Sequence, residues 1–317
     1  MQPKQLALFH NIHGKGELRI METYSPDAMV TLYQGDRLDL LKQIAEAGSK
    51  AELIITSPPY NVGKAYEQKT SLEAYVESQR ETIAACVEIL SSTGSICWQV
   101  GHYIEGSARN KEAFPLDLVL YPIFKSFNLK LRNRIVWYFG HGLHEQFRFS
   151  GRHETILWFT RDTDEYTFNL DPVRVPQKYP GKRAYRGPNK GRPSGNPLGK
   201  NPSDVWDMPN VKSNHVEKTG HPCQFPVALA ERLVLAMTHK GDLVVDPYLG
   251  VGTTAVASIL HDRRSAGADI EAGYLSIARD RLEKAWAGTL PTRPLNKPVY
   301  EPDSHMSLTQ VPKEWRE

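Results

Sequence analysis

The chain has few cysteines, no long apolar run and almost no net charge. Its three cysteines, Cys86, Cys97 and Cys223, are scattered over 317 residues. They form no disulfide framework, so a cysteine-stapled secreted domain is excluded and a reducing, cytoplasmic setting is favoured. No segment approaches the roughly 20 apolar residues that span a bilayer, and the polar N-terminus lacks a secretory signal. The net charge of +3 leaves nucleic-acid, protein and small-molecule partners all open.

A metal-binding pattern is also missing. His141, His144 and His153 are irregularly spaced, and no cysteine or carboxylate pattern joins them. His215 and His221 lie in a similarly unpatterned segment. Structural and catalytic zinc sites need three or four convergent ligands at characteristic spacings. We therefore predict no metal.

The alternation of apolar runs and helical periodicity predicts an α/β fold with a doubly wound, mostly parallel sheet. The run "AELIITS" (51–57) is typical of a strand buried on both faces of such a sheet. Further strands are expected at 29–36, 94–101, 132–139, 154–161, 242–246 and 265–270. Helices are expected at 37–48, 71–90, 116–127, 225–241 and 274–288.

A glycine-rich turn follows the late strand that ends at Asp246. Small residues between a strand and a helix let a ligand approach the backbone closely. A carboxylate at the end of the next strand, Asp269, is placed to bind ribose hydroxyls. The pattern therefore indicates a nucleoside-bearing cofactor, while a loose match to a dinucleotide fingerprint leaves NAD open. The candidate residues are Asp246, Pro247, Gly250, Gly252, Thr253, Thr254 and Asp269.

The early strand 51–57 ends in "SPPY", Ser57-Pro58-Pro59-Tyr60. The two prolines hold the backbone extended and prevent a helix from using the nearby carbonyls. The Ser57 hydroxyl and the Pro58 carbonyl can then accept both hydrogens of an exocyclic amine on a flat heterocyclic base. The Tyr60 ring can stack on that base. These contacts position the amine nitrogen for attack on an electrophilic methyl group, with no covalent protein intermediate.

Together, "TSPPY" and the later "DPYLGVGTT" resemble the β group of amino-directed, S-adenosylmethionine-dependent DNA methyltransferases. The resemblance covers roughly residues 30–285. It implies a class I methyltransferase fold with an inserted target-recognition region, base flipping and bacterial restriction–modification, with a separate endonuclease as a partner. "QGDRLDLL" and "GHPCQFPVALAERLV" resemble segments at the cofactor's adenine and methionine ends. They imply cofactor contacts for Asp36, Gln224, Phe225 and Pro226.

The resemblance also divides the chain. Residues 162–220 would form the recognition insert. Its core, 171–200, holds six prolines, five glycines and eight basic residues against one acid, Asp171. Such a surface can neutralise the phosphates of double-stranded DNA. Its candidate DNA-binding residues are Arg174, Lys178, Lys182, Arg183, Arg186, Lys190 and Arg192. The other parts would be an N-terminal arm (1–27), the catalytic part (28–161), the cofactor-binding part (221–287) and an extended tail (288–317).

Several alternatives stay open. In the resembling enzymes serine at position 57 is commoner for cytosine N4, and Asp or Asn for adenine N6, so N4 is favoured over N6. A nicotinamide-dependent oxidoreductase, a non-catalytic DNA-binding protein and an RNA or protein-glutamine methyltransferase are rivals. Pro222-Cys223-Gln224 matches the nucleophile tripeptide of cytosine-C5 methyltransferases, but it precedes the glycine loop, so Cys223 is not expected to be catalytic. A homodimer is one open oligomeric state.

Overall fold

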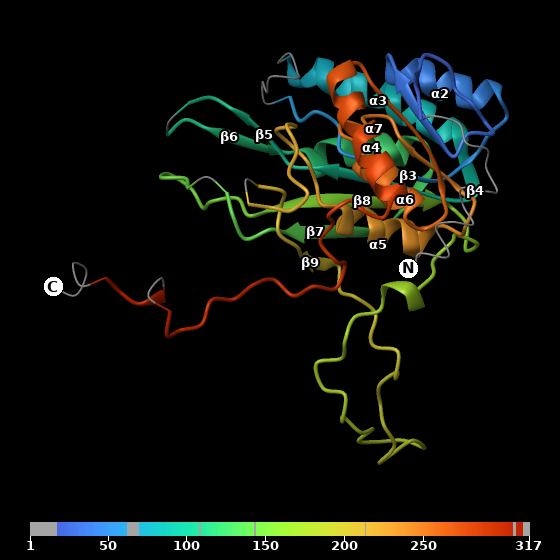
Figure 1. Cartoon of the computed structure of the whole chain (residues 1–317). Coiled ribbons are helices and arrows are strands. Elements are labelled where there is room, and N and C mark those ends of the chain that lie inside the picture. The colour runs from blue at the N-terminus through green and yellow to red at the C-terminus, as the bar shows by residue number, and fades with distance from the viewer. Residues whose placement is uncertain are drawn as a thin grey trace.

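The computed structural model describes residues 18–61, 70–107, 109–142, 144–212, 214–306 and 309–312. Within these residues a nine-stranded sheet has the order β1-β2-β11-β10-β3-β4-β8-β7-β9 (Figure 1). All neighbouring pairs are parallel except those of β8, which runs antiparallel to both β4 and β7. The prediction of a mostly parallel, doubly wound α/β sheet is confirmed. The strands are β1 (Ile20–Met21), β2 (Val30–Gln34), β3 (Ala51–Thr56), β4 (Leu90–Val100), β7 (Leu129–Tyr138), β8 (His153–Arg161), β9 (Val205–Asp207), β10 (Leu243–Asp246) and β11 (Arg264–Asp269).

Helices cover both faces of this sheet. Alternate side chains of β3 point to opposite faces, so Leu53 and Ile55 join one core and Ile54 joins the other. The first core includes α5 (Val227–Met237), α6 (Thr253–Ile259) and α7 (Ala272–Trp286). The second includes α2 (Arg37–Glu46), α3 (Leu72–Ile89) and α4 (Leu116–Ser126). This two-sided burial explains why the strand sequences read as continuous apolar runs.

Three features were not expected from the sequence. The short strand β1 lies in the predicted N-terminal arm and pairs in parallel with β2. A hairpin, β5 (His102–Glu105) and β6 (Glu112–Pro115), follows β4 directly. The short strand β9 pairs in parallel with β7, so residues 205–207 of the expected insert form an edge strand of the sheet. Pro122 lies inside α4.

The antiparallel direction of β8 determines where the segment 162–204 begins. Arg161, the last residue of β8, lies at the end of the sheet where β4 begins. Thr167 and Asn169 contact Thr93 and Ala236 at that same end. After the one-turn helix η1 (Asp171–Val173), the chain forms a long arm, 176–199, that projects away from the sheet (Figure 1). As expected, the arm contains no helix or named strand, only turns and a bridge between Arg183 and Pro193.

Candidate active site

The two sequence motifs meet at the carboxyl edge of the sheet. β3 and β10 are parallel neighbours, with Leu53 opposite Val244 and Ile54 opposite Val245. Their ends therefore reach the same edge, where a crevice of an open α/β sheet usually binds ligands. One cavity of about 580 Å³ is lined by both Ser57 and the Gly250 loop. The two motifs thus lie together at a single cavity.

Asp246 connects the two motifs through hydrogen bonds to both. Its carboxylate accepts hydrogen bonds from the hydroxyls of Thr56 and Thr254, each at 2.7 Å, and from the N–H of Tyr248 at 3.1 Å. Its side chain is buried and does not line the cavity. Burial raises the pKa of Asp246 to about 6, although its three donors act in the opposite direction. Asp246 therefore fixes the cofactor loop and β3 relative to each other.

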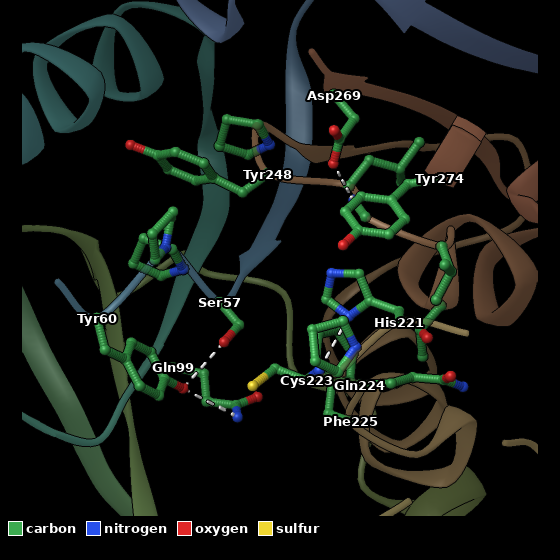
Figure 2. Close-up of a pocket in the computed structure, with 18 of the residues that line it drawn as sticks. Ser57, Tyr60, Gln99, His221, Cys223, Gln224, Phe225, Tyr248, Asp269 and Tyr274 are labelled. Carbon is green, nitrogen blue, oxygen red and sulfur yellow. Dashed lines mark hydrogen bonds between the residues drawn. The ribbon is translucent and has the colours of Figure 1, made fainter. Parts of the chain in front are cut away.

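A hydrogen-bonded chain occupies the target-base end of the cavity. The Tyr60 hydroxyl lies 2.9 Å from the Ser57 hydroxyl and donates to Glu154 at 3.0 Å. Gln99 donates to the same Glu154 oxygen at 2.7 Å. Figure 2 shows Ser57, Tyr60 and Gln99 together at this end of the cavity. Burial, followed by the nearby Glu154 charge, raises the pKa of Tyr60 well above its ordinary value. Tyr60 is therefore a neutral phenol that can donate to Glu154 and accept from Ser57.

The backbone around Tyr60 is shaped to admit its ring. A Cβ on Gly101 would lie 3.2 Å from the ring edge, so the absence of a side chain there lets Tyr60 rest against the end of β4. Asn61 adopts a left-handed φ of 58°, and its buried side chain bonds both backbone groups of Thr70. Residues 62–69 lie outside the described residues. This undescribed range includes Lys64, Tyr66 and Glu67, which are candidates for lining the pocket.

The opposite end of the cavity carries carboxylates and rings. Asp269 accepts a hydrogen bond from the N–H of Gly250 at 3.0 Å and another from the N–H of Glu271 at 2.8 Å. Burial is the main cause that raises the pKa of Asp269. The ring of His221 packs edge-on against that of Tyr274, with centroids 4.5 Å apart (Figure 2). Burial also lowers the pKa of His221, which favours a neutral imidazole in this wall.

Two glycines in the loop have left-handed backbones, Gly250 with φ 53° and Gly252 with φ 74°. A Cβ on Gly252 would lie 2.8 Å from that of Ala278 in α7, so glycine is required for the close packing of the loop on this helix. Gly250 instead borders the cavity, next to His221.

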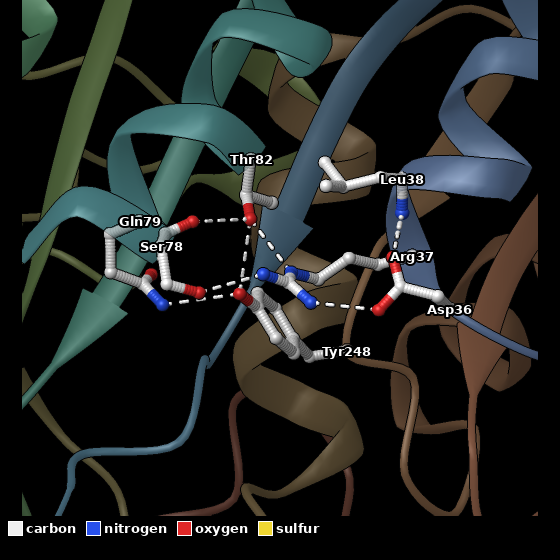
Figure 3. Close-up of polar contacts among 7 residues, drawn as sticks. All are labelled: Asp36, Arg37, Leu38, Ser78, Gln79, Thr82 and Tyr248. Carbon is white, nitrogen blue, oxygen red and sulfur yellow. Dashed lines mark hydrogen bonds and ion pairs between the residues drawn. The ribbon is translucent and has the colours of Figure 1, made fainter. Parts of the chain in front are cut away.

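Asp36 begins α2 and lies at the rim of the cavity. Its carboxylate accepts from the N–H of Leu38 at 2.8 Å and pairs with Arg37 at 3.0 Å. Arg37 also donates to Ser78 and Thr82 on α3, and its guanidinium carbon lies 5.2 Å from the centre of the Tyr248 ring. This network, drawn in Figure 3, locks the position of the Tyr248 ring, whose hydroxyl also bonds Gln79.

The segment before α5 is held together internally. Gln224 donates to the carbonyl of Glu217 at 3.0 Å and accepts from Thr219 at 2.9 Å. Glu217 in turn accepts from the N–H of Val227, the first residue of α5, at 2.8 Å. The side chain of Gln224 thus shapes the loop, while Phe225 offers an apolar surface to the cavity.

The cavity unites most of the residues that the sequence singled out. It is lined by Ser57, Pro58, Pro59, Tyr60, Asp36, Gln224, Phe225, Pro247, Gly250, Thr253 and Asp269. Four others do not line it: Pro226, Asp246, Gly252 and Thr254. The DNA-binding candidates, Arg174 to Arg192, lie outside it. Two of them make bonds within their own segment, Arg174 to Gly199 and Arg183 to Gly191.

Sequence reasoning did not single out several residues of the cavity wall, among them Gln99, Glu154, His221, Tyr248 and Tyr274. Glu154 gave a weak signal, because an acidic residue opens an otherwise apolar strand. The exposed Cys223 also lines the cavity. Among the described residues, no cluster of histidine, cysteine or carboxylate side chains could hold a metal.

The residues present fit the expected cofactor and base. Gln99 and Asn210 line the cavity, and their buried amide oxygens have no hydrogen-bond partner among the described residues. Such orphaned acceptors indicate that the cavity binds polar groups. Asp269 and Glu271 can accept from ribose hydroxyls, and Phe225 provides an apolar contact for a cofactor chain. S-adenosylmethionine matches this donor and acceptor set.

Comparisons with known proteins agree with the site. A DNA methylase family model, that of the N6/N4 methylases, matches residues 51–280. Type II methyltransferase M.BglII of Bacillus subtilis is 48% identical over 280 residues, which cover 87% of this chain and 76% of that protein. DNA adenine methyltransferase YhdJ of Escherichia coli (strain K12) is 32% identical over 80% of this chain and 83% of its own length.

Solved structures show the same fold. The cytosine-N4-specific PvuII DNA methyltransferase has a TM-score of 0.60 at 18% identity, covering 84% of this chain and 94% of its own. The complex of M1.HpyAVI with S-adenosylmethionine has a TM-score of 0.55 at 20% identity, with 80% and 98% covered. Among the described residues, no helix is long and apolar enough to cross a membrane. The family model and the relatives overturn the oxidoreductase alternative. The chain belongs to the N6/N4 family of DNA methylases, which take their methyl group from S-adenosylmethionine.

Proposed function

We propose that this DNA methylase transfers a methyl group to the N4 amine of a cytosine flipped out of a specific duplex sequence. The observation that carries the proposal is the hydrogen-bonded chain from Ser57 through Tyr60 to Glu154, at the end of the cavity opposite Asp269. It supplies an ordered set of oxygen acceptors for an exocyclic amine. Base flipping is required because the cavity cannot reach an amine inside a stacked duplex.

The acceptors would activate the amine by position. Its two hydrogens would point to the Ser57 hydroxyl oxygen and to the Pro58 carbonyl, and the Tyr60 ring would stack on the base. Bound S-adenosylmethionine supplies an electrophilic methyl group on a positively charged sulfur. The amine nitrogen would form a bond to that methyl carbon as the carbon–sulfur bond breaks, with the bonding pair left on sulfur.

The nitrogen then loses one proton. As the Ser57 oxygen takes that proton, the Ser57 hydroxyl proton can pass to Tyr60 and the Tyr60 proton to Glu154. The high pKa of Tyr60 suits this role, because the phenol carries the proton without remaining ionised. Gln99, which donates to Glu154, keeps that carboxylate directed toward Tyr60.

Ser57 supports cytosine rather than adenine, since the resembling N4 enzymes more often have serine at this position. The likeness to the cytosine-N4-specific PvuII enzyme is one of fold only. The name of YhdJ, an adenine methyltransferase, supports the alternative base. Both amines offer the same two hydrogens to Ser57 and Pro58, so the base must be identified directly.

The deciding experiment is mass analysis of nucleosides from DNA of varied sequence after incubation with the protein and S-adenosylmethionine. We expect N4-methyldeoxycytidine. The Glu154→Gln variant should form it at least about tenfold more slowly if proton removal limits the rate. N6-methyldeoxyadenosine would overturn the choice of base. No methylated nucleoside in any duplex would overturn the catalytic proposal and favour a non-catalytic DNA-binding protein.

We further propose a restriction–modification role in a bacterial cytoplasm, beside a separate endonuclease of the same sequence specificity. The names of the relatives, Type II methyltransferases of bacteria, support this role. Plasmid DNA from cells that express the protein should resist one Type II endonuclease. Complete cleavage by a panel of such enzymes, despite detected methylation, would argue against a protective role.

A further inference from the structure

Two projections extend from the catalytic edge next to Tyr60 and form what we call the lip. The lip comprises the β5–β6 hairpin (102–115) and the loop between β7 and β8 (139–152), described except for positions 108 and 143. Both extend to the left in Figure 1. The guanidinium carbon of Arg109 lies 4.9 Å from the Phe147 ring centre, and Lys111 pairs with Glu145 at 3.5 Å. These contacts make the hairpin and the loop one unit.

The lip begins at the target-base site itself. The hairpin starts immediately after Gly101, against which the Tyr60 ring packs. The loop ends immediately before β8, whose Glu154 accepts the Tyr60 hydrogen bond. His102 and His153 lie where the two parts of the lip join the sheet, and the centroids of their rings are 6.0 Å apart. Any duplex that places a flipped base against Tyr60 must therefore approach the lip.

The lip exposes aromatic rings to water. Phe149 is 100% exposed and Phe147 is 54% exposed. A large apolar ring gains nothing from such exposure and would gain by burial in a complex. Arg148 and Arg152 flank Phe149 in the sequence, and Arg148 is partly neutralised by its 3.0 Å pair with Glu145. An aromatic tip between cations fits the stacked bases and phosphates of DNA.

The basic arm lies away from the catalytic edge. The chain enters the segment that carries the arm at the end of the sheet opposite Tyr60, because β8 runs antiparallel to β4. Arm residues 176–199 project away from the sheet, and none of them lines the cavity (Figure 1). The surface beside the flipped base must therefore come from other elements, and the lip is adjacent to it.

We propose that the lip docks on duplex DNA beside the target base and that Phe149 enters the base stack in the space left by the flipped base. The inference rests on the proposed base-flipping function. Inserting an apolar side chain between bases compensates part of the unstacking cost, which is a few kcal/mol. Phe149 thereby stabilises the extruded base without touching it.

The test compares Phe149→Ala with the unaltered protein on two duplexes. One has a fully paired target base, and the other has the same target opposite an abasic position, where extrusion costs less. We expect Phe149→Ala to lower kcat/KM about tenfold or more on the paired duplex and less than about threefold on the second, since one tenfold step is about 1.4 kcal/mol. Phe149→Trp should restore the rate on the paired duplex.

A second readout follows extrusion directly. 2-Aminopurine at the target position should brighten on binding to the unaltered protein and much less on binding to Phe149→Ala. The matched control is Tyr300→Ala, which removes another exposed ring, 71% accessible and located in the tail. It should match the unaltered protein in both assays, and all variants should keep the same Tm and S-adenosylmethionine affinity.

Two results would overturn the proposed insertion of Phe149 into the base stack. One is an unchanged rate and fluorescence for Phe149→Ala, and the other is an equal loss on both duplexes, which would make Phe149 an ordinary contact. In either case the unaltered protein still methylates DNA. If the proposed function itself were wrong, the unaltered protein would methylate neither duplex, which distinguishes the two failures.

Discussion

The hydroxyl of Thr56 donates a 2.7 Å hydrogen bond to Asp246, 190 positions away in the chain. Thr56 directly precedes Ser57, and Asp246 directly precedes the cofactor loop. The bond therefore connects the backbone that would hold the amine to the backbone that would hold the methyl donor. A misplacement of about 1 Å in such a geometry can reduce a rate about a hundredfold.

Replacing Thr56 with valine should test this connection. The change keeps the shape but removes the donor, so we expect about 1–3 kcal/mol lower stability and a fall in kcat larger than any rise in KM for S-adenosylmethionine. Thr254→Val is the matched control, because it removes the other 2.7 Å bond to Asp246 without altering β3. Equal losses of kcat in the two variants, measured by tritium transfer, would contradict the expectation.

Tyr60→Phe should separate the hydroxyl from the ring. The variant keeps the stacking surface but breaks the path from Ser57 to Glu154, so we expect kcat to fall about a hundredfold, as for loss of a general acid–base group. Tyr60→Ala should lose more, because the ring is gone as well. S-adenosylmethionine affinity by calorimetry should stay nearly constant in both; a parallel loss of affinity would mean that Tyr60 is structural.

Asp269→Asn should chiefly weaken cofactor binding. The amide oxygen can still accept from Gly250, but the charge and part of the acceptor capacity are lost. We expect Kd for S-adenosylmethionine to rise at least about tenfold, which corresponds to about 1.4 kcal/mol. Glu271→Gln, a carboxylate change in the same cavity, should have a smaller effect. A reversed order in equilibrium dialysis would assign the ribose contact to Glu271 instead.

The basic arm should contribute to DNA affinity through phosphates. Arg183 is unsuitable for a test because its guanidinium bonds Gly191 within the arm. Arg186→Gln combined with Lys190→Gln should instead lower the magnitude of the slope of log Kd against log salt by about 1.8, or about 0.9 per phosphate contact. The charge-matched control is Lys42→Gln with Lys284→Gln on α2 and α7, which should leave the slope unchanged. A slope unaffected by the arm variant would exclude its phosphate contacts.

The titration of Asp246 should appear in the stability of the fold. Its folded pKa of about 6 exceeds the ordinary 3.8, so between these values the folded protein holds a proton that the unfolded chain has released. The contribution of this group is thus greatest below pH 4 and is lost as the pH rises through 6. The unfolding free energy of the protein minus that of Asp246→Asn should fall by about 2 kcal/mol from pH 4 to pH 7.

Urea unfolding at several pH values measures this difference. The three donors to Asp246, from Thr56, Thr254 and Tyr248, favour the charged carboxylate. A difference that stays constant or rises with pH would show that these hydrogen bonds outweigh burial.

The sequence predicted the central strands and both motifs well, because each depends on local patterns. The apolar run of β3 and the prolines after Ser57 are sufficient to place that strand end. Glu154 could not be placed at Tyr60 in this way, because its position depends on the pairing of Thr155 with Val100 across two antiparallel strands. The β5–β6 hairpin and β9 were missed for a similar reason, since short strands are defined by their partners more than by their composition.

The root of the arm is closed by a pair of reciprocal backbone bonds. Val175 donates to the carbonyl of Lys200 at 3.0 Å, and Lys200 donates back at 2.9 Å. The chain therefore enters and leaves the arm at one fixed point, and the entropic cost of a loop grows only slowly with its length. An arm of different length or composition can be exchanged there while the catalytic edge keeps its geometry. If the arm contacts DNA as predicted, sequence preference and methylation chemistry can diverge independently in this architecture.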